Sequence, residues 1–147
     1  MKLSESSQQK LELFFQDYLN DKNFTLPKIN IYAGRFSRFL TSILKIYGIT
    51  FGKHIFIQPQ LFTKNSKNKL KINEELAAHE IAHVLQYKRE GSIRFLYKYQ
   101  KSYWKNLRKK EKWDSNARIE AYFEIPFEIE ARETAEKFRF WNKNLKN

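Results

Sequence analysis

The residues best suited to chemistry in this chain are His79, Glu80 and His83, which form the pattern His-Glu-x-x-His. On an α-helix, positions i and i+4 lie about 40° apart around the axis, so the two imidazoles face the same way. They can therefore ligate one metal ion, while Glu80 lies beside them, able to reach a water on that metal. The spacing predicts a zinc site, and the helix around it must position the ligands.

The residues around this pattern favour a helix from about Asn73 to Arg89. We predict Asn73 as its N-cap and Gly91 as its end. No Gly or Pro interrupts the segment, and apolar faces are supplied by Leu76, Ala77, Ile81, Ala82, Val84 and Leu85. The alternative is a buried helix in which the two histidines only pack or hydrogen-bond.

A catalytic zinc site needs a third protein ligand and a position open to water. The extension that would add a third histidine is absent, because Gln86 and Arg89 occupy the places where Gly and His would be needed. His54 is a lone strand residue, which is more typical of a satisfied surface side chain than of a ligand. A carboxylate from a later helix is the economical choice, and the candidates are Glu120, Glu124, Glu128 and Glu130.

Composition predicts one globular domain that spans residues 1–147, with 41% hydrophobic and 16% aromatic residues. The absence of cysteine excludes both a disulfide framework and a cysteine-based metal site. No apolar run is long enough to span a membrane. Polar residues rather than a signal-peptide core follow Met1, so we expect a cytoplasmic location unless a specialised machine exports the chain.

The hydrophobic pattern predicts helices separated by a few strands. In the helix expected over 35–47, we predict that Phe36 and Phe39 face inward, with Leu40, Ile43 and Leu44. The other expected helices cover 4–20, 73–89, 92–110, 115–125 and 126–141. The expected strands cover 27–32 and 49–58, the second broken by a turn or bulge at Gly52.

The net charge is +12, and part of it follows one helix face. This basic stripe, at steps of three and four residues, consists of Arg94, Lys98, Lys101, Lys105, Arg108 and Lys112. The opposite, packed face is expected to carry Leu96, Tyr99, Tyr103 and Leu107. Such a stripe is usually a solvated face. The functional alternative is weak contact with an acidic surface, either lipid or nucleic acid, or with an acidic substrate.

The run from Leu76 to Tyr87, followed by Gly91, resembles the zincin metallopeptidases, and within them the gluzincin-like branch whose third ligand is a Glu on a later helix. It is similar to a group of small bacterial metallopeptidase domains, some associated with contractile injection systems. That group also has a strand before the motif, like 49–57 here, and a late Tyr-x-x-Ile-Pro-Phe-Glu-x-Glu-Ala segment, here 122–131. The resemblance covers roughly residues 48–135.

The resemblance implies an α+β fold, mainly α and zincin-like, with a small sheet packed on the motif helix. It also implies Glu128 as the third ligand, ahead of Glu130. Related zincins use the first Glu of a Glu-x-x-x-Asp pattern, which residues 128–132 match except that Arg132 replaces the Asp. This departure removes the residue that usually supports a ligating histidine.

The predicted function is therefore a zinc metallopeptidase acting on a peptide or protein substrate. Zinc would activate a water, and Glu80 would serve as general base. The strand His54 to Ile57 would be the edge that binds an extended peptide by strand addition. Tyr122 and Tyr103 are both candidates for stabilising the oxyanion, and the sequence singles out neither.

Two other classes of function are compatible with the sequence. One is a non-catalytic, zinc-stabilised binding module, or a delivered effector that docks through the basic helix over 94–112. The intact Glu80 argues against a purely structural site, which has no need of a base. A weaker option, based on charge alone, is nucleic-acid binding through the basic stripe.

Overall fold

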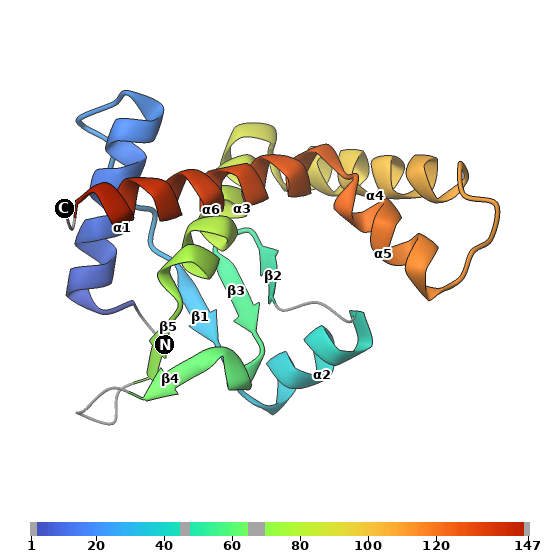
Figure 1. Ribbon diagram of the computed structural model, residues 1–147, viewed down its shortest axis with the longest axis horizontal. Helices are drawn as coiled ribbons and strands as arrows, with labels where there is room; N and C mark the ends of the chain where they lie inside the picture. The colour runs from blue at the N-terminus through green and yellow to red at the C-terminus, as the bar shows by residue number, and fades with distance from the viewer. Residues whose placement is uncertain (1–2, 45–47, 65–69, 146–147) are drawn as a thin grey trace.

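The computed structural model describes residues 3–44, 48–64 and 70–145 (Figure 1). Within these ranges the chain forms six α-helices and five short strands, so the α+β, mainly α prediction is confirmed. The helices are α1 (Glu5–Leu19), α2 (Arg35–Leu44), α3 (Glu74–Glu90), α4 (Ser92–Leu107), α5 (Ser115–Phe123) and α6 (Pro126–Asn144). None of the described helices is both long and apolar enough to cross a membrane.

A three-stranded mixed sheet lies beside α3. Its strands are β1 (Asn30–Tyr32), β2 (Gly48–Phe51) and β3 (His54–Ile57), in the order β1-β3-β2. The turn between β2 and β3 contains Gly52 at φ 57°, a backbone conformation that suits glycine, as the predicted break requires. β3 is thus the central strand, and the prediction that it is the edge is wrong. The cause is a long-range pairing, because β1 lies parallel to β3 with Ile31 opposite Ile55.

Two further strands, which the sequence pattern did not indicate, form an antiparallel pair below α3. They are β4 (Phe62–Lys64) and β5 (Leu70–Ile72), and a short 3₁₀ turn (Pro59–Leu61) precedes them. The residues between them, 65–69, lie outside the described part of the chain.

The motif helix α3 begins and ends where the sequence predicts. Its N-cap is Asn73, whose Oδ1 accepts a hydrogen bond from the Glu75 backbone N–H at 2.8 Å. It ends at Gly91, which has φ 78°. Its apolar side enters the main core together with the inner face of the sheet, α1 and α6. The sheet contributes Ile31, Ile55 and Ile57, and α3 contributes Ala77, Ala78, Ile81 and Val84.

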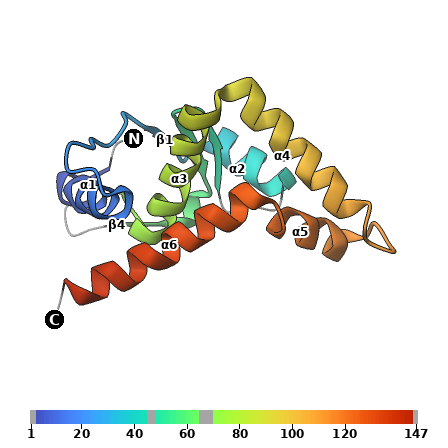
Figure 2. The same cartoon turned by 90° about the horizontal axis from the view of Figure 1, so that it is seen from above.

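The helices α4 and α5 form a projecting arm, and α6 then packs back on α3. α4 and α5 extend to one end of the molecule, and α6 runs back across α3 (Figures 1 and 2). α4 ends at Leu107 rather than at residue 110, so Arg108 and Lys112 lie beyond the helix. Asn106 is buried at this end, and its Nδ2 donates to the Ala121 carbonyl of α5 at 3.2 Å. Pro126 begins α6, as predicted.

The orientation of α2 differs from the prediction. Phe36 and Phe39 are 62% and 60% exposed, whereas Ser37 and Thr41 are buried. The Thr41 hydroxyl donates to the Ser37 carbonyl at 2.7 Å, which satisfies this polar side chain within the helix. A face of small residues therefore points inward in place of the aromatic one. The side chains of Leu40, Ile43 and Leu44 and all of residues 45–47 lie outside the described part of the chain.

Candidate metal centre

Two helices bring the candidate ligands together. α3 presents His79 and His83 from successive turns, and the first turn of α6 presents Glu128. α6 begins directly before Glu128 because Pro126 suits a first helical position, where no backbone N–H is needed. The N-terminal end of a helix also favours a carboxylate. The sequence therefore places Glu128 at one of the few positions where a buried carboxylate receives support from the helix itself.

The three side chains have the spacing of ligands around one cation. His83 Nε2 lies 3.3 Å from Glu128 Oε1, and His79 Nε2 lies 3.6 Å from Glu128 Oε2. The two imidazole Nε2 atoms are 3.2 Å apart. In a tetrahedral zinc site with ligand distances of about 2.0–2.1 Å, neighbouring donor atoms are separated by about 3.3–3.4 Å. This metal-site group (His79, His83 and Glu128) could therefore hold a metal ion.

The other candidate carboxylates are engaged elsewhere. Glu120 and Glu124 lie 3.0 and 2.7 Å from the Lys110 ammonium. Glu130 accepts two hydrogen bonds from Arg89, at 2.8 and 2.9 Å. Of the four, the structure brings Glu128 to the histidines. Its Oε2 atom is buried and has no hydrogen-bond partner, which leaves an acceptor available to a cation.

Gln86 fixes the orientation of His83. The Gln86 side chain is fully buried, and its Nε2 donates to the Phe127 carbonyl at 3.0 Å. Because an amide donates only through nitrogen, the atom that faces His83 Nδ1 at 2.8 Å is the Gln86 carbonyl oxygen. Nδ1 therefore carries a hydrogen, and Nε2, the atom that faces Glu128, is the nitrogen that a metal would bind. Gln86 thus supports the histidine and also ties α3 to the start of α6.

Two tyrosines surround the Glu128 carboxylate. The Tyr99 hydroxyl of α4 donates to Glu128 Oε1 at 2.7 Å, and Tyr122 of α5 lies close enough for the Glu128 charge to act on its pKa. Burial raises the pKa of both tyrosines, and the nearby Glu128 charge raises it further. Both hydroxyls therefore stay protonated, and that of Tyr99 donates to Glu128. Burial alone would raise the pKa of Glu128, but the adjacent His79 and His83 rings and the Tyr99 hydroxyl hold the pKa below the usual range.

His83 is a strongly basic imidazole in this setting. Burial is the largest single effect and lowers its pKa, but Glu128, Glu80 and Gln86 together raise the pKa to about 9. A proton on Nε2 and a metal cation would compete for the same position, since only the unprotonated nitrogen can ligate. The same negative surroundings that raise the pKa of His83 also attract a divalent cation.

Glu80 lies beside the metal-site group, held by strand β2. Its side chain is 2% exposed, and its Oε2 accepts a hydrogen bond from the Thr50 hydroxyl at 2.6 Å. Gly48 of the same strand leaves room for the carboxylate, because a Cβ there would overlap Glu80 Oε1. Glu80 also acts electrostatically on His83 and Tyr122, which places it near both. β2 therefore positions the predicted general base.

The remaining residues singled out from the sequence lie apart from this group. Arg132 donates to the Phe123 carbonyl and lies over the Phe123 ring, so it has no role at the histidines. His54 Nδ1 lies 3.0 Å from the Tyr32 hydroxyl, which agrees with its prediction as a satisfied strand residue. Tyr103 packs against two buried hydrophobic clusters, one that contains Phe95 and one that contains Leu107.

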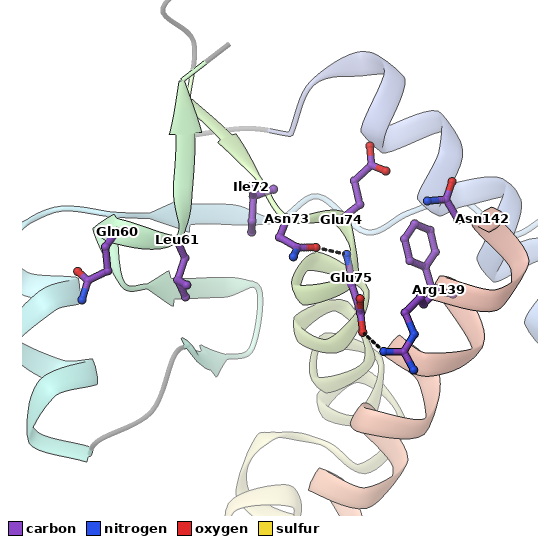
Figure 3. A pocket seen from close by; sticks show the side chains of 9 residues that line it. Gln60, Leu61, Ile72, Asn73, Glu74, Glu75, Arg139 and Asn142 are labelled. Atoms are coloured by element: carbon purple, nitrogen blue, oxygen red, sulfur yellow. Dashed lines mark hydrogen bonds and ion pairs between the residues drawn. The ribbon is translucent and has the colours of Figure 1, made fainter. Parts of the chain in front are cut away.

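A surface pocket elsewhere is unrelated to the metal-site group. It lies at the N-terminal end of α3, near Asn73 and Glu75, and Arg139 of α6 reaches Glu75 across it at 3.7 Å (Figure 3). None of its lining residues belongs to the metal-site group. This pocket therefore does not include the residues His79, Glu80 and His83, for which the sequence predicts chemistry.

Comparison with known families matches residues 3–91 to the eCIS core domain, which is the core domain of extracellular contractile injection systems. The matched region is more than half of the chain. The chain belongs to the eCIS core domain family. This supports an association with a contractile injection system, in agreement with that part of the predicted resemblance. No curated protein and no solved structure matches the chain.

The eCIS core domain match ends at the turn after α3. It includes His79, Glu80 and His83, whereas Glu128, Tyr99 and Tyr122 come from the helices beyond it. The metal-site group is therefore assembled from the family domain together with the helical segment that follows it.

Sequence reasoning missed four residues that shape this site: Gly48, Thr50, Gln86 and Tyr99. Gln86 had a detectable signal, since it lies three residues after His83 and such positions are neighbours on a helix. Tyr99 was assigned only to the packed face of its helix. The role of the two β2 residues depends on the position of that strand over Glu80, which no local pattern encodes.

We predict that the purified protein binds one zinc ion and that Glu128→Ala lowers the zinc affinity by more than about 100-fold. Changes in the outer shell alone usually cost about 10- to 100-fold, and Glu128 is an inner ligand in this account. The matched control is Glu130→Ala, whose carboxylate is bound to Arg89. Competition titration with a fluorescent chelator measures all three proteins. Equal affinity of wild type and Glu128→Ala would contradict the assignment.

We also predict that Gly48→Ala destabilises the fold by about 1–3 kcal/mol, the usual range for an added methyl group in a packed site. The Glu80 carboxylate must move and give up its hydrogen bond with Thr50. Gly34→Ala is the control, because a Cβ at Gly34 meets nothing within 4 Å. Urea unfolding compares the variants. If Gly48→Ala is as stable as wild type, Glu80 is not confined against β2.

Proposed function

We propose that this protein is a zinc-dependent metallopeptidase that hydrolyses peptide bonds, with Glu80 as its general base. The observation that carries the proposal is a buried carboxylate, held by Thr50, directly beside the metal-site group. A site that only stabilises a fold needs four ligands and no neighbouring base. A group of three ligands with such a base is typical of metal-assisted hydrolysis.

The roles of the chain's own residues follow from their positions. His79, His83 and Glu128 would hold a zinc ion, which when bound supplies a Lewis acid and lowers the pKa of water. Glu80 accepts a proton from the attacking water and returns it to the leaving amine. The Thr50 hydroxyl holds Glu80 Oε2, so the carboxylate keeps one orientation during both transfers.

Tyr122 is the better candidate for stabilising the oxyanion. Both Glu128 and Glu80 act on its pKa, whereas Tyr103 also packs against Leu107, Ala117 and Ala121, between α4 and α5. Burial raises the pKa of Tyr122, and the charge of Glu128 raises it further, so the hydroxyl stays a donor. A neutral donor beside the metal-site group is suited to an oxygen that gains negative charge in the transition state.

The position of β2 supports an extended peptide as the substrate. In the part of the chain that the structure describes, β2 pairs with β3 on one side and has no strand on its other side. An edge strand presents backbone groups to which a peptide can add. Since β2 also carries Thr50 beside Glu80, a peptide on this edge would lie next to the proposed base.

The alternative is a non-catalytic module that zinc stabilises, or an effector that a contractile injection system delivers. Family membership supports the association with such a system. A delivered protein can also be an enzyme. The two proposals therefore differ in one respect, which is whether zinc at the metal-site group catalyses hydrolysis or only stabilises the fold.

We predict that Glu80→Gln keeps the fold and zinc while peptide cleavage falls by about 100- to 10,000-fold, the usual contribution of a positioned base. The amide is nearly isosteric and can still accept the Thr50 hydrogen bond. Cleavage of a peptide library by the zinc-loaded protein, followed by mass spectrometry, measures the activity. Glu128→Ala should lose zinc and activity together.

Two results would contradict the mechanism. Equal cleavage by wild type and Glu80→Gln would show that Glu80 is not the general base. Absence of cleavage by zinc-loaded wild type on peptide libraries and denatured proteins would favour the non-catalytic module.

A further inference from the structure

Helix α4 has an apolar face that the rest of the described chain does not cover. Ile93, Tyr97 and Trp104 are 88%, 64% and 46% exposed. They are four and seven residues apart, so they project from one side of the helix. Tyr99 projects from another side, where its hydroxyl contacts Glu128. The exposed face is therefore separate from the side of α4 that serves the metal-site group.

Two further large side chains extend this surface. Leu96 is 40% exposed on α4, and Trp113 is 53% exposed in the segment after it. The rings of Trp104 and Trp113 lie 6.2 Å apart, so the surface continues past the end of the helix. We call this the α4 apolar face, which consists of Ile93, Leu96, Tyr97, Trp104 and Trp113.

Basic side chains border the α4 apolar face, and some of them have no acidic partner among the described residues. Arg94 and Lys98, which belong to the predicted basic stripe, are paired with Glu90 at 3.6 and 2.6 Å. Lys101, Lys105 and Arg108 are exposed, and no carboxylate among the described residues pairs with them. The Lys101 ammonium lies 5.8 Å from the centre of the Tyr97 ring, at the boundary between the two surfaces.

We propose that the α4 apolar face docks on an anionic phospholipid surface. Trp and Tyr side chains favour the boundary between headgroups and acyl chains, and flanking Lys and Arg side chains extend to the phosphates. A helix with one apolar and one basic side lies in the plane of that boundary. Here the basic side consists of Lys101, Lys105 and Arg108, and the net charge of +12 adds attraction at longer range.

The composition of this face favours lipid over single-stranded nucleic acid. Bases stack on aromatic rings, and a basic groove follows the backbone. The most exposed large side chain here is Ile93, an aliphatic residue that offers no stacking surface but enters acyl chains readily. α4 also lies on the projecting arm of the molecule, where it can meet a flat surface (Figures 1 and 2).

The test uses the full chain with lipid vesicles at low salt. We expect binding to vesicles of equimolar phosphatidylcholine and phosphatidylserine, and none to pure phosphatidylcholine. Tryptophan emission should shift to shorter wavelength on binding, because Trp104 and Trp113 leave water. Replacing Lys101, Lys105 and Arg108 with Gln should weaken binding by about 100-fold, or about fivefold for each charge.

An apolar variant separates insertion from simple charge attraction. Replacing Ile93, Tyr97 and Trp104 with Ser keeps every charge and should weaken vesicle binding at least about tenfold, since three exposed apolar side chains are lost. Phe140→Ser is the matched control, because Phe140 is 59% exposed on α6 near the opposite end of the molecule. Its vesicle binding should equal that of wild type. Circular dichroism confirms that each variant is folded.

Three results would overturn the proposal. The first is that wild type does not bind the mixed vesicles at low salt. The second is that the apolar variant binds them as tightly as wild type. In the third, single-stranded DNA binds in place of the vesicles, and the same apolar variant abolishes that binding. None of these measurements depends on peptide cleavage, so they are independent of the proposed function.

Discussion

The buried carboxylate of Glu128 is the constraint on which the rest of this structure depends. A buried charge costs several kcal/mol unless partners surround it, so the fold must deliver those partners. α3 supplies His79 and His83, α4 supplies the Tyr99 hydroxyl, and α5 places Tyr122 nearby. Each helix from α3 to α6 therefore contributes to one cluster. The arm formed by α4 and α5 projects from the rest of the molecule, and its Tyr99 also contributes to the site.

This arrangement joins the eCIS core domain to the helices that follow it. The matched region carries the histidines, Glu80 as the proposed general base, and strand β2, whereas the later helices carry Glu128 and the tyrosines. Gln86 connects the two parts, because it contacts His83 on α3 and the backbone of Phe127 on α6. A change in the packing of α6 on α3 would therefore alter the ligand geometry and the orientation of His83 together.

Local features of the sequence predicted local structure well. The N-cap Asn73, the terminating Gly91 and the turn at Gly52 all act through nearby backbone groups, and the structure confirms them. The errors came from contacts between distant segments. β3 became the central strand because β1 pairs with it, and Phe36 became exposed because α2 turns a face of small residues inward. The contact of Gln86 with α6 likewise depends on a packing that no local pattern encodes.

The most direct test of the central claim is a zinc-soaked crystal measured on both sides of the zinc absorption edge. We predict one anomalous peak per chain, within about 2.0–2.2 Å of His79 Nε2, His83 Nε2 and a Glu128 oxygen. Glu80 should lie outside ligand distance of that peak. A peak at His54 or Glu130, or direct ligation by Glu80, would contradict the account.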